Sequence, residues 1–179
     1  MKIQRASFNT FLVLPLLLIS SIGGAAENEK NQDEPNQKKQ ASTLRLFLEV
    51  NQAMADHAQQ VPLFRAKPVK VNVEKEEFLN EGYVDHASVL DQDGVVLIKV
   101  QFDKRGAWLL ENITASNQGK RIAIFSQFGE GRWLAAPLIS RRIGDGLLVF
   151  TPDANRQEAE RIVRGLNNVA AKAKKKNKF

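Results

Sequence analysis

An α+β fold, a mainly antiparallel sheet with two helices, is predicted by three features of the sequence. Strand patterns come in pairs joined by short turns, instead of alternating with helices as in a parallel sheet. Two segments, one after Asp103 and one after Thr151, carry the apolar spacing and the capping residues of helices. The 179 residues are 43% hydrophobic and 26% charged and include no cysteine, which predicts one globular domain without disulfide bonds.

Seven segments are predicted to be strands, and residues 43–50 and 69–73 among them alternate apolar and polar residues with a period of two. In sequence order they are residues 43–50, 69–73, 84–90, 94–102, 121–125, 133–139 and 147–150. Asp93-Gly94 predicts a tight hairpin turn, because both residues tolerate a positive φ. Pro137 has no N–H to donate, so the strand that contains it is expected at a sheet edge or to end in a bulge.

The two predicted helices have polar caps and apolar faces. Asp103 is expected to cap the first helix, and Gly119 to end it. Thr151 is expected to cap the second, with Pro152 at its first helical position. The apolar faces are Ala107, Leu110 and Ile113 in the first helix and Ala159, Ile162, Val163, Leu166, Val169 and Ala170 in the second.

Residues 1–26 have the features of a secretory signal peptide. Lys2 and Arg5 precede a short apolar run over residues 11–19, and small residues precede an expected cleavage site after Ala26. The protein is therefore expected in the periplasm or otherwise exported. An uncleaved N-terminal membrane anchor is the alternative.

The remaining chain divides into three parts by composition. Residues 27–41 are almost free of apolar side chains and are predicted to be a disordered linker. Residues 42–170 are predicted to form the folded domain. Residues 171–179 form a basic tail with five lysines, interpreted as a solvated helix end. A weak contact of this Lys-rich tail with a membrane surface is the alternative.

No catalytic, cofactor-binding or metal-binding residues are predicted. His57 and His86 are the only histidines and lack the spacing of a metal site. The acidic turn at residues 91–94 lacks the glutamate that ends a calcium-binding loop, because Phe102 stands at that position. The net charge of +6 is spread along the chain without an aromatic-basic motif, so no nucleic-acid partner is expected.

Five short sequence motifs follow one another within residues 82–159. They are GYVDHASV at 82–89, KVQFDKRGA at 99–107, ITASNQGKRIAI at 113–124, APLI at 136–139, and FT followed by EA at 150–159. Together they resemble the head subdomain of the first periplasmic region of SecD-type protein-export membrane proteins, here expected in a stand-alone version. The resemblance implies that α+β fold, and a secretory polypeptide or the Sec accessory complex as the protein partner.

The function expected from these observations is that of an exported, non-catalytic protein-binding module associated with Sec-dependent protein export. The alternative is a cell-envelope interaction factor unrelated to export that uses the same fold. Tryptophan and arginine are frequent anchors of buried interfaces. Both occur directly after the turn at residues 129–131, and two arginines follow the next strand. We expect one edge surface that docks an extended or acidic partner, formed by Phe128, Arg132, Trp133, Arg141 and Arg142. Alternatively, Trp133 belongs to the core and the arginines to solvated turns.

Overall fold

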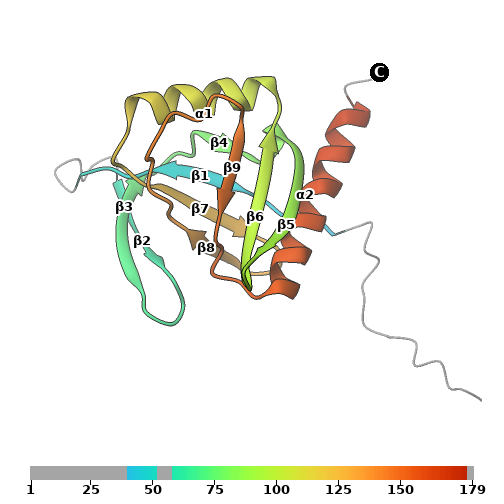
Figure 1. Ribbon diagram of the computed structural model, residues 1–179, viewed down its shortest axis with the longest axis horizontal. Coiled ribbons are helices and arrows are strands. Elements are labelled where there is room, and N and C mark those ends of the chain that lie inside the picture. Colours follow the sequence, from blue (N-terminus) through green and yellow to red (C-terminus); the bar gives the residue numbers. More distant parts are fainter. Residues whose placement is uncertain (1–39, 52–57, 177–179) are drawn as a thin grey trace, which may run out of the picture. The chain divides into compact units, whose positions relative to one another are not determined.

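A computed structural model of the protein describes residues 40–51 and 58–176 (Figure 1). The expectations for residues 1–26, for residues 27–39 of the linker, for His57 and for the last three tail residues lie outside this part of the chain. Within it, no helix is both long enough and apolar enough to cross a membrane.

The described residues form two sheets, one separate hairpin and two long helices, and all paired strands are antiparallel. The four-stranded sheet has the order β4 (Leu79–Asn80), β1 (Arg45–Leu48), β7 (Ile122–Gln127), β8 (Gly131–Ala135). The three-stranded sheet has the order β5 (Val84–Gln92), β6 (Val95–Phe102), β9 (Leu147–Phe150). The hairpin is β2 (Ala58–Leu63) with β3 (Val69–Glu74), and the helices are α1 (Lys104–Ser116) and α2 (Arg156–Lys176). The predicted α+β fold class is confirmed.

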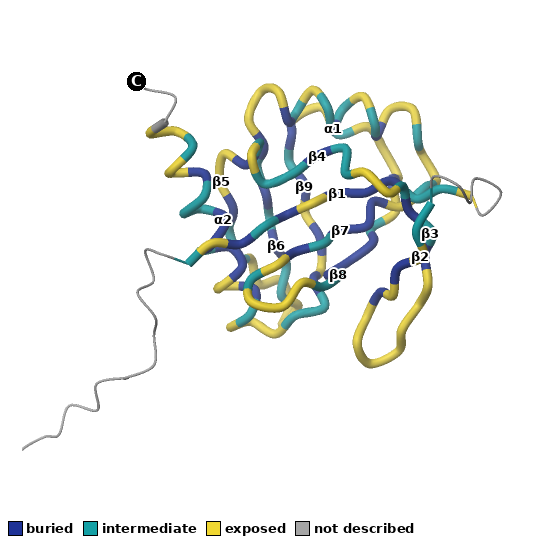
Figure 2. Tube along the Cα trace, turned by 180° about the vertical axis from the view of Figure 1, so that it is seen from behind, coloured by how far each residue is buried: buried dark blue, intermediate teal, exposed yellow. Residues whose placement is uncertain are grey.

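The main core lies between the two sheets, which face each other, and is closed by the helices. Helix α1 lies across one end of the strands and α2 lies beside β5 (Figure 1). Buried residues of β1, β6, β7, β9, α1 and α2 belong to this core, including Leu46, Ile98, Leu110, Ile124, Leu148 and Leu166. Figure 2 shows the buried stretches inside these elements and the exposed loops around them.

A second, smaller core lies on the other face of the four-stranded sheet. Successive residues of a strand point to opposite faces, so Phe47 and Ala123 point away from the main core that holds Leu46 and Ile124. The β2–β3 hairpin covers this face with Val61, Leu63, Val71 and Val73. Strand β2 is not predictable from its sequence pattern, because Gln59, Gln60 and Pro62 break its apolar alternation.

Two local predictions about the strands, a tight turn and an edge position, are confirmed. The turn between β5 and β6 has a positive φ at both Asp93 (52°) and Gly94 (79°). Strand β8 lies at a sheet edge, but it runs from Gly131 to Ala135 instead of continuing to residue 139, so Pro137 lies outside it. His86 lies exposed on β5 beside Asp85.

The cap of the first helix is confirmed, and its end differs from the prediction. Asp103 Oδ1 accepts a hydrogen bond from the N–H of Gly106 at 2.8 Å. The helix ends at Ser116, and Gly119 lies in the following loop, where its φ is +85°. The N–H of Gly119 donates to the carbonyl of Ile139 at 2.9 Å, so this glycine joins the loop to the segment after β8.

The start of the second helix was predicted wrongly. Helix α2 begins at Arg156, and its cap is Asn155 instead of Thr151. Asn155 Oδ1 accepts from the N–H of Glu158 at 2.9 Å, and Glu158 Oε2 accepts from the N–H of Asn155 at 3.0 Å. This reciprocal pair satisfies two N–H groups at the helix start. The segment before it is held as a turn, because Pro152 is buried and the N–H of Asp153 donates to the carbonyl of Leu134 on β8.

The apolar stripe of α2 faces the main core as predicted. Ala159, Ile162 and Leu166 are fully buried, and Val163 and Ala170 are nearly so, whereas Val169 is only half-buried. The helix extends through Lys176, so the first part of the predicted basic tail is its last turns.

Candidate functional site

The two edges of the three-stranded sheet differ in what covers their backbone groups. At the β5 edge, Asn167 of α2 acts as a substitute strand. Its Oδ1 accepts from the N–H of Ala87 at 2.8 Å, and its Nδ2 donates to the carbonyl of Ala87 at 2.9 Å. Farther along, Lys174 Nζ donates to the carbonyl of Asp85 at 3.1 Å and pairs with its carboxylate at 2.7 Å. Helix α2 therefore blocks this edge.

The opposite edge, formed by β9, is open. The N–H of Phe102 donates to the carbonyl of Gly146 at 3.0 Å, and the same register pairs Leu148 with Val100. Hydrogen-bonded pairs alternate along an antiparallel ladder, so the backbone groups of Leu147 and Val149 point away from β6. Asp145 Oδ1 accepts from the N–H of Leu147 at 3.0 Å. Within the described residues, the N–H and carbonyl of Val149 and the carbonyl of Leu147 have no hydrogen-bond partner.

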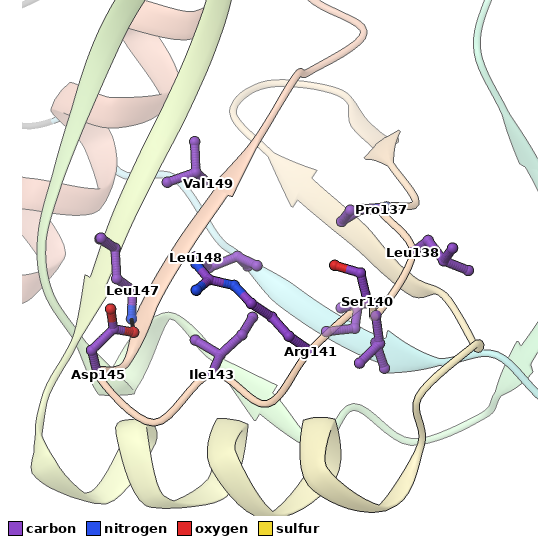
Figure 3. A pocket seen from close by; sticks show the side chains of 11 residues that line it. Pro137, Leu138, Ser140, Arg141, Ile143, Asp145, Leu147, Leu148 and Val149 are labelled. Atoms are coloured by element: carbon purple, nitrogen blue, oxygen red, sulfur yellow. Dashed lines mark hydrogen bonds between the residues drawn. The ribbon is translucent and has the colours of Figure 1, made fainter.

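A groove of about 210 Å³ runs along this open edge (Figure 3). One wall is β9, and the other is the segment from Pro137 to Arg141 that follows β8. The side chains of Val149 and Leu138 at this groove are 42% and 53% exposed. The groove thus combines free backbone groups with accessible apolar side chains.

Arg141 supplies a free positive charge to the β9 groove. Its side chain extends from its loop toward β9 in Figure 3. In the part of the chain that the structure describes, Arg141 has no carboxylate partner. The neighbouring Arg142 differs, because it pairs with the carboxylate of Glu111 on α1. Asp145 also lines the groove, but its carboxylate already accepts from the N–H of Leu147.

A second cleft, of about 430 Å³, lies between the tip of the β2–β3 hairpin and the β7–β8 hairpin. It is lined by Pro62, Phe64, Arg65, Pro68, Phe125, Gly131, Arg132, Trp133 and Asp153. Trp133 packs edge-on against Phe47 and Phe125, with ring centroids 5.1 and 5.3 Å apart. Phe64 is 45% exposed and has a φ of 63°, a left-handed conformation that is uncommon for a bulky residue. We call this cleft the aromatic cleft.

A cluster of four charged side chains holds the rim of the aromatic cleft. Arg65 of the hairpin tip pairs with Asp153 at 3.5 Å and with Glu158 at 3.2 Å. Arg132 Nη1 donates to the carbonyl of Asp153 at 2.8 Å. Its Nη2 lies 3.1 Å from Glu158 Oε2 without the alignment of a hydrogen bond, so this contact is an ion pair. The cluster ties β2–β3 and β8 to the start of α2.

Glu158 is the acidic centre of that cluster. Burial raises the pKa of Glu158, but the hydrogen bond from the Asn155 N–H and the charges of Arg132 and Arg65 outweigh it. The pKa of Glu158 is therefore lower than that of an ordinary glutamate. Its carboxylate is ionised at neutral pH, where it caps α2 and neutralises the two arginines.

The five predicted site residues fall into two groups. Phe128 is half-buried against the main core, with the guanidinium carbons of Arg132 and Arg161 at 5.4 and 6.0 Å from its ring centre. Arg132 and Trp133 line the aromatic cleft, whereas Arg141 lines the β9 groove and Arg142 pairs with α1. The aromatic cleft and the β9 groove share no lining residue.

The parts of the site that depend on tertiary pairing were not predicted from the sequence. Residues 147–150 were predicted as a strand, but their continuous apolar run gave no sign of an edge position. Phe64 and Arg65 were not singled out, because the hairpin that presents them was not predicted. Among the described residues, no group of three or more histidine, aspartate or glutamate side chains is arranged to hold a metal ion.

These observations define a class of molecule. It is a small α+β scaffold whose three-stranded sheet has one blocked and one open edge. The chain belongs to the family of the SecDF P1 head subdomain, whose sequence profile matches residues 53–170. The predicted resemblance to SecD-type proteins is thereby confirmed.

Two kinds of relatives agree with this assignment. The protein translocase subunit SecD of Acidaminococcus fermentans is 33% identical over 78 residues, which cover 44% of this chain and 18% of that protein. A solved structure of SecDF, a membrane component that enhances protein export, superposes with a TM-score of 0.53 at 18% identity, over 72% of this chain and 63% of that chain. SecDF in a super-membrane-facing form gives a TM-score of 0.52 at 20% identity, over 72% of this chain and 19% of that chain. This chain thus spans less than a fifth of the SecD protein that it matches, and the structural likeness concerns the fold.

Proposed function

We propose that this domain is a non-catalytic module that binds extended polypeptides in Sec-dependent protein export. The observation that carries the proposal is the open edge of β9, whose free N–H and carbonyl groups lie beside a groove. An extended chain adds to such an edge by forming main-chain hydrogen bonds, which require no particular sequence. A protein that handles many different secretory polypeptides needs this kind of recognition.

Side chains of the groove add a preference to the backbone pairing. Val149 and Leu138 offer apolar contacts, and Arg141 offers a guanidinium that is free among the described residues. Guanidinium groups bind carboxylates through two parallel hydrogen bonds. We therefore expect the groove to favour extended segments that place an acidic residue beside an apolar one.

The membership of the chain in the SecDF P1 head family supports export as the setting. The relatives with this domain are named for protein translocation and for enhancing protein export. The expected signal peptide at residues 1–26 would place the domain in the periplasm, and N-terminal sequencing of the exported protein tests this placement. A mature protein that begins at Glu27 is the expected result, and an intact Met1 in the membrane fraction would indicate an anchored form.

A proline in β9 tests the binding edge. Val149→Pro removes the outward N–H and fills the edge with a ring, while the bonds of Leu148 to β6 remain possible. The matched control is Val149→Thr, which keeps the N–H and the β-branched shape. Binding is measured by fluorescence anisotropy with a labelled, reduced and carboxymethylated secretory protein, which cannot refold.

We expect Val149→Pro to lose binding and Val149→Thr to keep it. The carboxymethyl groups make the probe acidic, so the Arg141→Glu variant should bind it more weakly than the Val149→Thr variant does. Equal binding by the proline and threonine variants, with both folded by circular dichroism, would rule out the β9 edge as the binding site.

A further inference from the structure

Helix α1 carries the most exposed large apolar side chain of the described residues. The side chain of Trp108 is 63% exposed. It lines a shallow hollow of about 310 Å³ together with Tyr83, Lys104, Arg105 and Leu109. A tryptophan exposed to this extent leaves a large apolar ring in water, and together with the hollow beside it forms an accessible apolar surface.

The cations beside Trp108 are free of carboxylate partners. Lys104 and Arg105 are both exposed, and neither forms an ion pair within the described part of the chain. The Arg105 guanidinium lies 5.9 Å from the centre of the Tyr83 ring, and this cation–π contact holds it at the rim of the hollow. The nearest acid in sequence, Asp103, is engaged as the cap of α1.

The end of α2 extends the same basic surface. Lys174 binds Asp85, two residues after Tyr83, and thereby neutralises that carboxylate. Lys172 and Lys175 are exposed and form no ion pair among the described residues. Helix α1 and the C-terminal end of α2 lie at the same end of the fold in both views (Figures 1 and 2). We call the surface made by Tyr83, Lys104, Arg105, Trp108, Lys172, Lys174 and Lys175 the Trp108 face.

We propose that the Trp108 face binds the surface of a membrane that contains anionic phospholipids. Tryptophan and tyrosine rings prefer the headgroup region, where the ring is partly apolar and the N–H or hydroxyl stays hydrated. Lysines and arginines near an anionic leaflet are attracted to its negative potential. Four of the five cations are lysines, whose flexible point charges suit a diffuse anionic surface better than the fixed geometry of one carboxylate.

Vesicle binding by the full chain tests the Trp108 face. Trp108 and Trp133 are the only tryptophans, so the background Trp133→Phe leaves Trp108 as the sole fluorescent reporter. With vesicles of phosphatidylcholine mixed with phosphatidylglycerol, the emission of Trp108 should shift to shorter wavelength as its ring leaves water. High salt should reverse the shift, because it screens the charges. Vesicles of phosphatidylcholine alone should produce a much smaller shift.

A matched pair of charge reversals separates this face from the net charge of the protein. The double variant K104E and R105E should weaken binding to the anionic vesicles by about tenfold or more. The double variant K67E and K70E changes the net charge equally, at exposed lysines of the β2–β3 hairpin, and should change binding by less than about twofold. Equal losses in the two double variants, or no shift of Trp108 emission on anionic vesicles, would overturn the proposal. A shift of the same size on both kinds of vesicle would also overturn it, because anionic headgroups would then have no role.

Discussion

At the scale of single residues, Gly165 shows how one missing side chain sets the packing of a helix. The glycine is buried in the middle of α2, where it would ordinarily lower helix stability by about 1 kcal/mol relative to alanine. The segment that leads into β1 passes directly over it. A Cβ at this position would lie 2.6 Å from the backbone nitrogen of Ser42 and would also collide with the Ser42 hydroxyl. The glycine therefore lets the chain cross the helix.

Replacement of Gly165 with alanine tests this explanation. We expect a loss of about 1–3 kcal/mol of unfolding free energy, because the backbone of Ser42 must move to make room. Ala171→Gly, at an exposed position of the same helix, should show the ordinary preference and cost about 0.5–1 kcal/mol. Urea denaturation of both variants measures the difference. An increase in stability for Gly165→Ala would mean that the close approach to Ser42 is relaxed at no cost.

Glu158 makes stability depend on pH in a defined direction. Its pKa is lower in the folded protein than in the unfolded chain, so its ionised form stabilises the fold. That contribution is fully present above the unfolded pKa of about 4.3 and is lost as the pH falls through the lower folded pKa. Glu158→Gln should therefore lower stability at pH 7 by about 1–3 kcal/mol, because Arg132 and the Asn155 N–H lose a charged partner.

The difference between the Glu158→Gln variant and the original protein should narrow as the pH falls below about 4. Glu160→Gln is the matched control, because Glu160 is exposed and its one ion pair, to Arg156, is a loose contact of 3.9 Å. It should change stability by less than about 0.5 kcal/mol at either pH. Urea denaturation at pH 7 and near pH 3.5 measures both variants. A difference for Glu158→Gln that stays constant with pH would exclude the ion-pair cluster as its cause.

Residue chemistry also explains which helix starts were predictable. Asp103 is followed by a continuous helical pattern, so its role as a cap was evident from the sequence. At the second helix two candidate starts lie four residues apart, Thr151-Pro152 and Asn155 with Glu158. The choice depends on Leu134, whose carbonyl holds the N–H of Asp153 in a turn. A contact between residues so far apart in sequence leaves no local signal.

At the scale of elements, the fold protects one sheet edge with a side-chain amide. Asn167 pairs with both backbone groups of Ala87, as a neighbouring strand would. Exposed edges invite pairing with other chains, and proteins commonly block them. The strands themselves were largely predictable from their apolar patterns and turn residues, but which edge is open was not. That property depends on where α2 packs, which only the three-dimensional arrangement decides.

Substitution of Asn167 with leucine should expose the cost of an unpaired edge. Leucine has the same side-chain branching as asparagine but no polar groups, so the N–H and carbonyl of Ala87 lose their partners in a partly buried place. We expect a loss of about 1–3 kcal/mol of unfolding free energy. Asn112→Leu removes an amide that bonds only to the Trp108 carbonyl on the exposed side of α1, and should cost less than about 0.5 kcal/mol. Equal stability losses, measured by urea denaturation, would show that the Asn167 amide has no special role.

At the scale of the whole domain, the two cores differ in size and in which elements they join. The main core unites both sheets and both helices. The smaller core joins the β2–β3 hairpin to one face of the four-stranded sheet. The hairpin strands bond mostly to each other, and to the rest of the fold through the contacts of Glu49 and Val50 with the end of β3. Its tip is held to α2 by Arg65.

This division predicts that the hairpin opens without global unfolding. Regions with few buried contacts exchange their amide hydrogens through local openings of low free energy. The amides of β2 and β3 should therefore exchange faster than those of β6 and β7, which lie in the main core. Arg65→Ala should increase the amide exchange rates in the hairpin about two- to fivefold over those of the original protein, because exposed ion pairs contribute about 0.5–1 kcal/mol.

Hydrogen exchange read by mass spectrometry distinguishes local from global opening. In the Arg65→Ala variant, peptides from the hairpin should exchange faster, while peptides from β6 and β7 keep their rates. Lys67→Ala, in the same exposed loop and without an ion pair among the described residues, should change neither set. If β6 and β7 sped up together with the hairpin, the domain would be opening as one unit, and the smaller core would not be an independent part of it. Because the tip of this hairpin forms one wall of the aromatic cleft, local opening would also let the cleft change its width without disturbing the β9 groove.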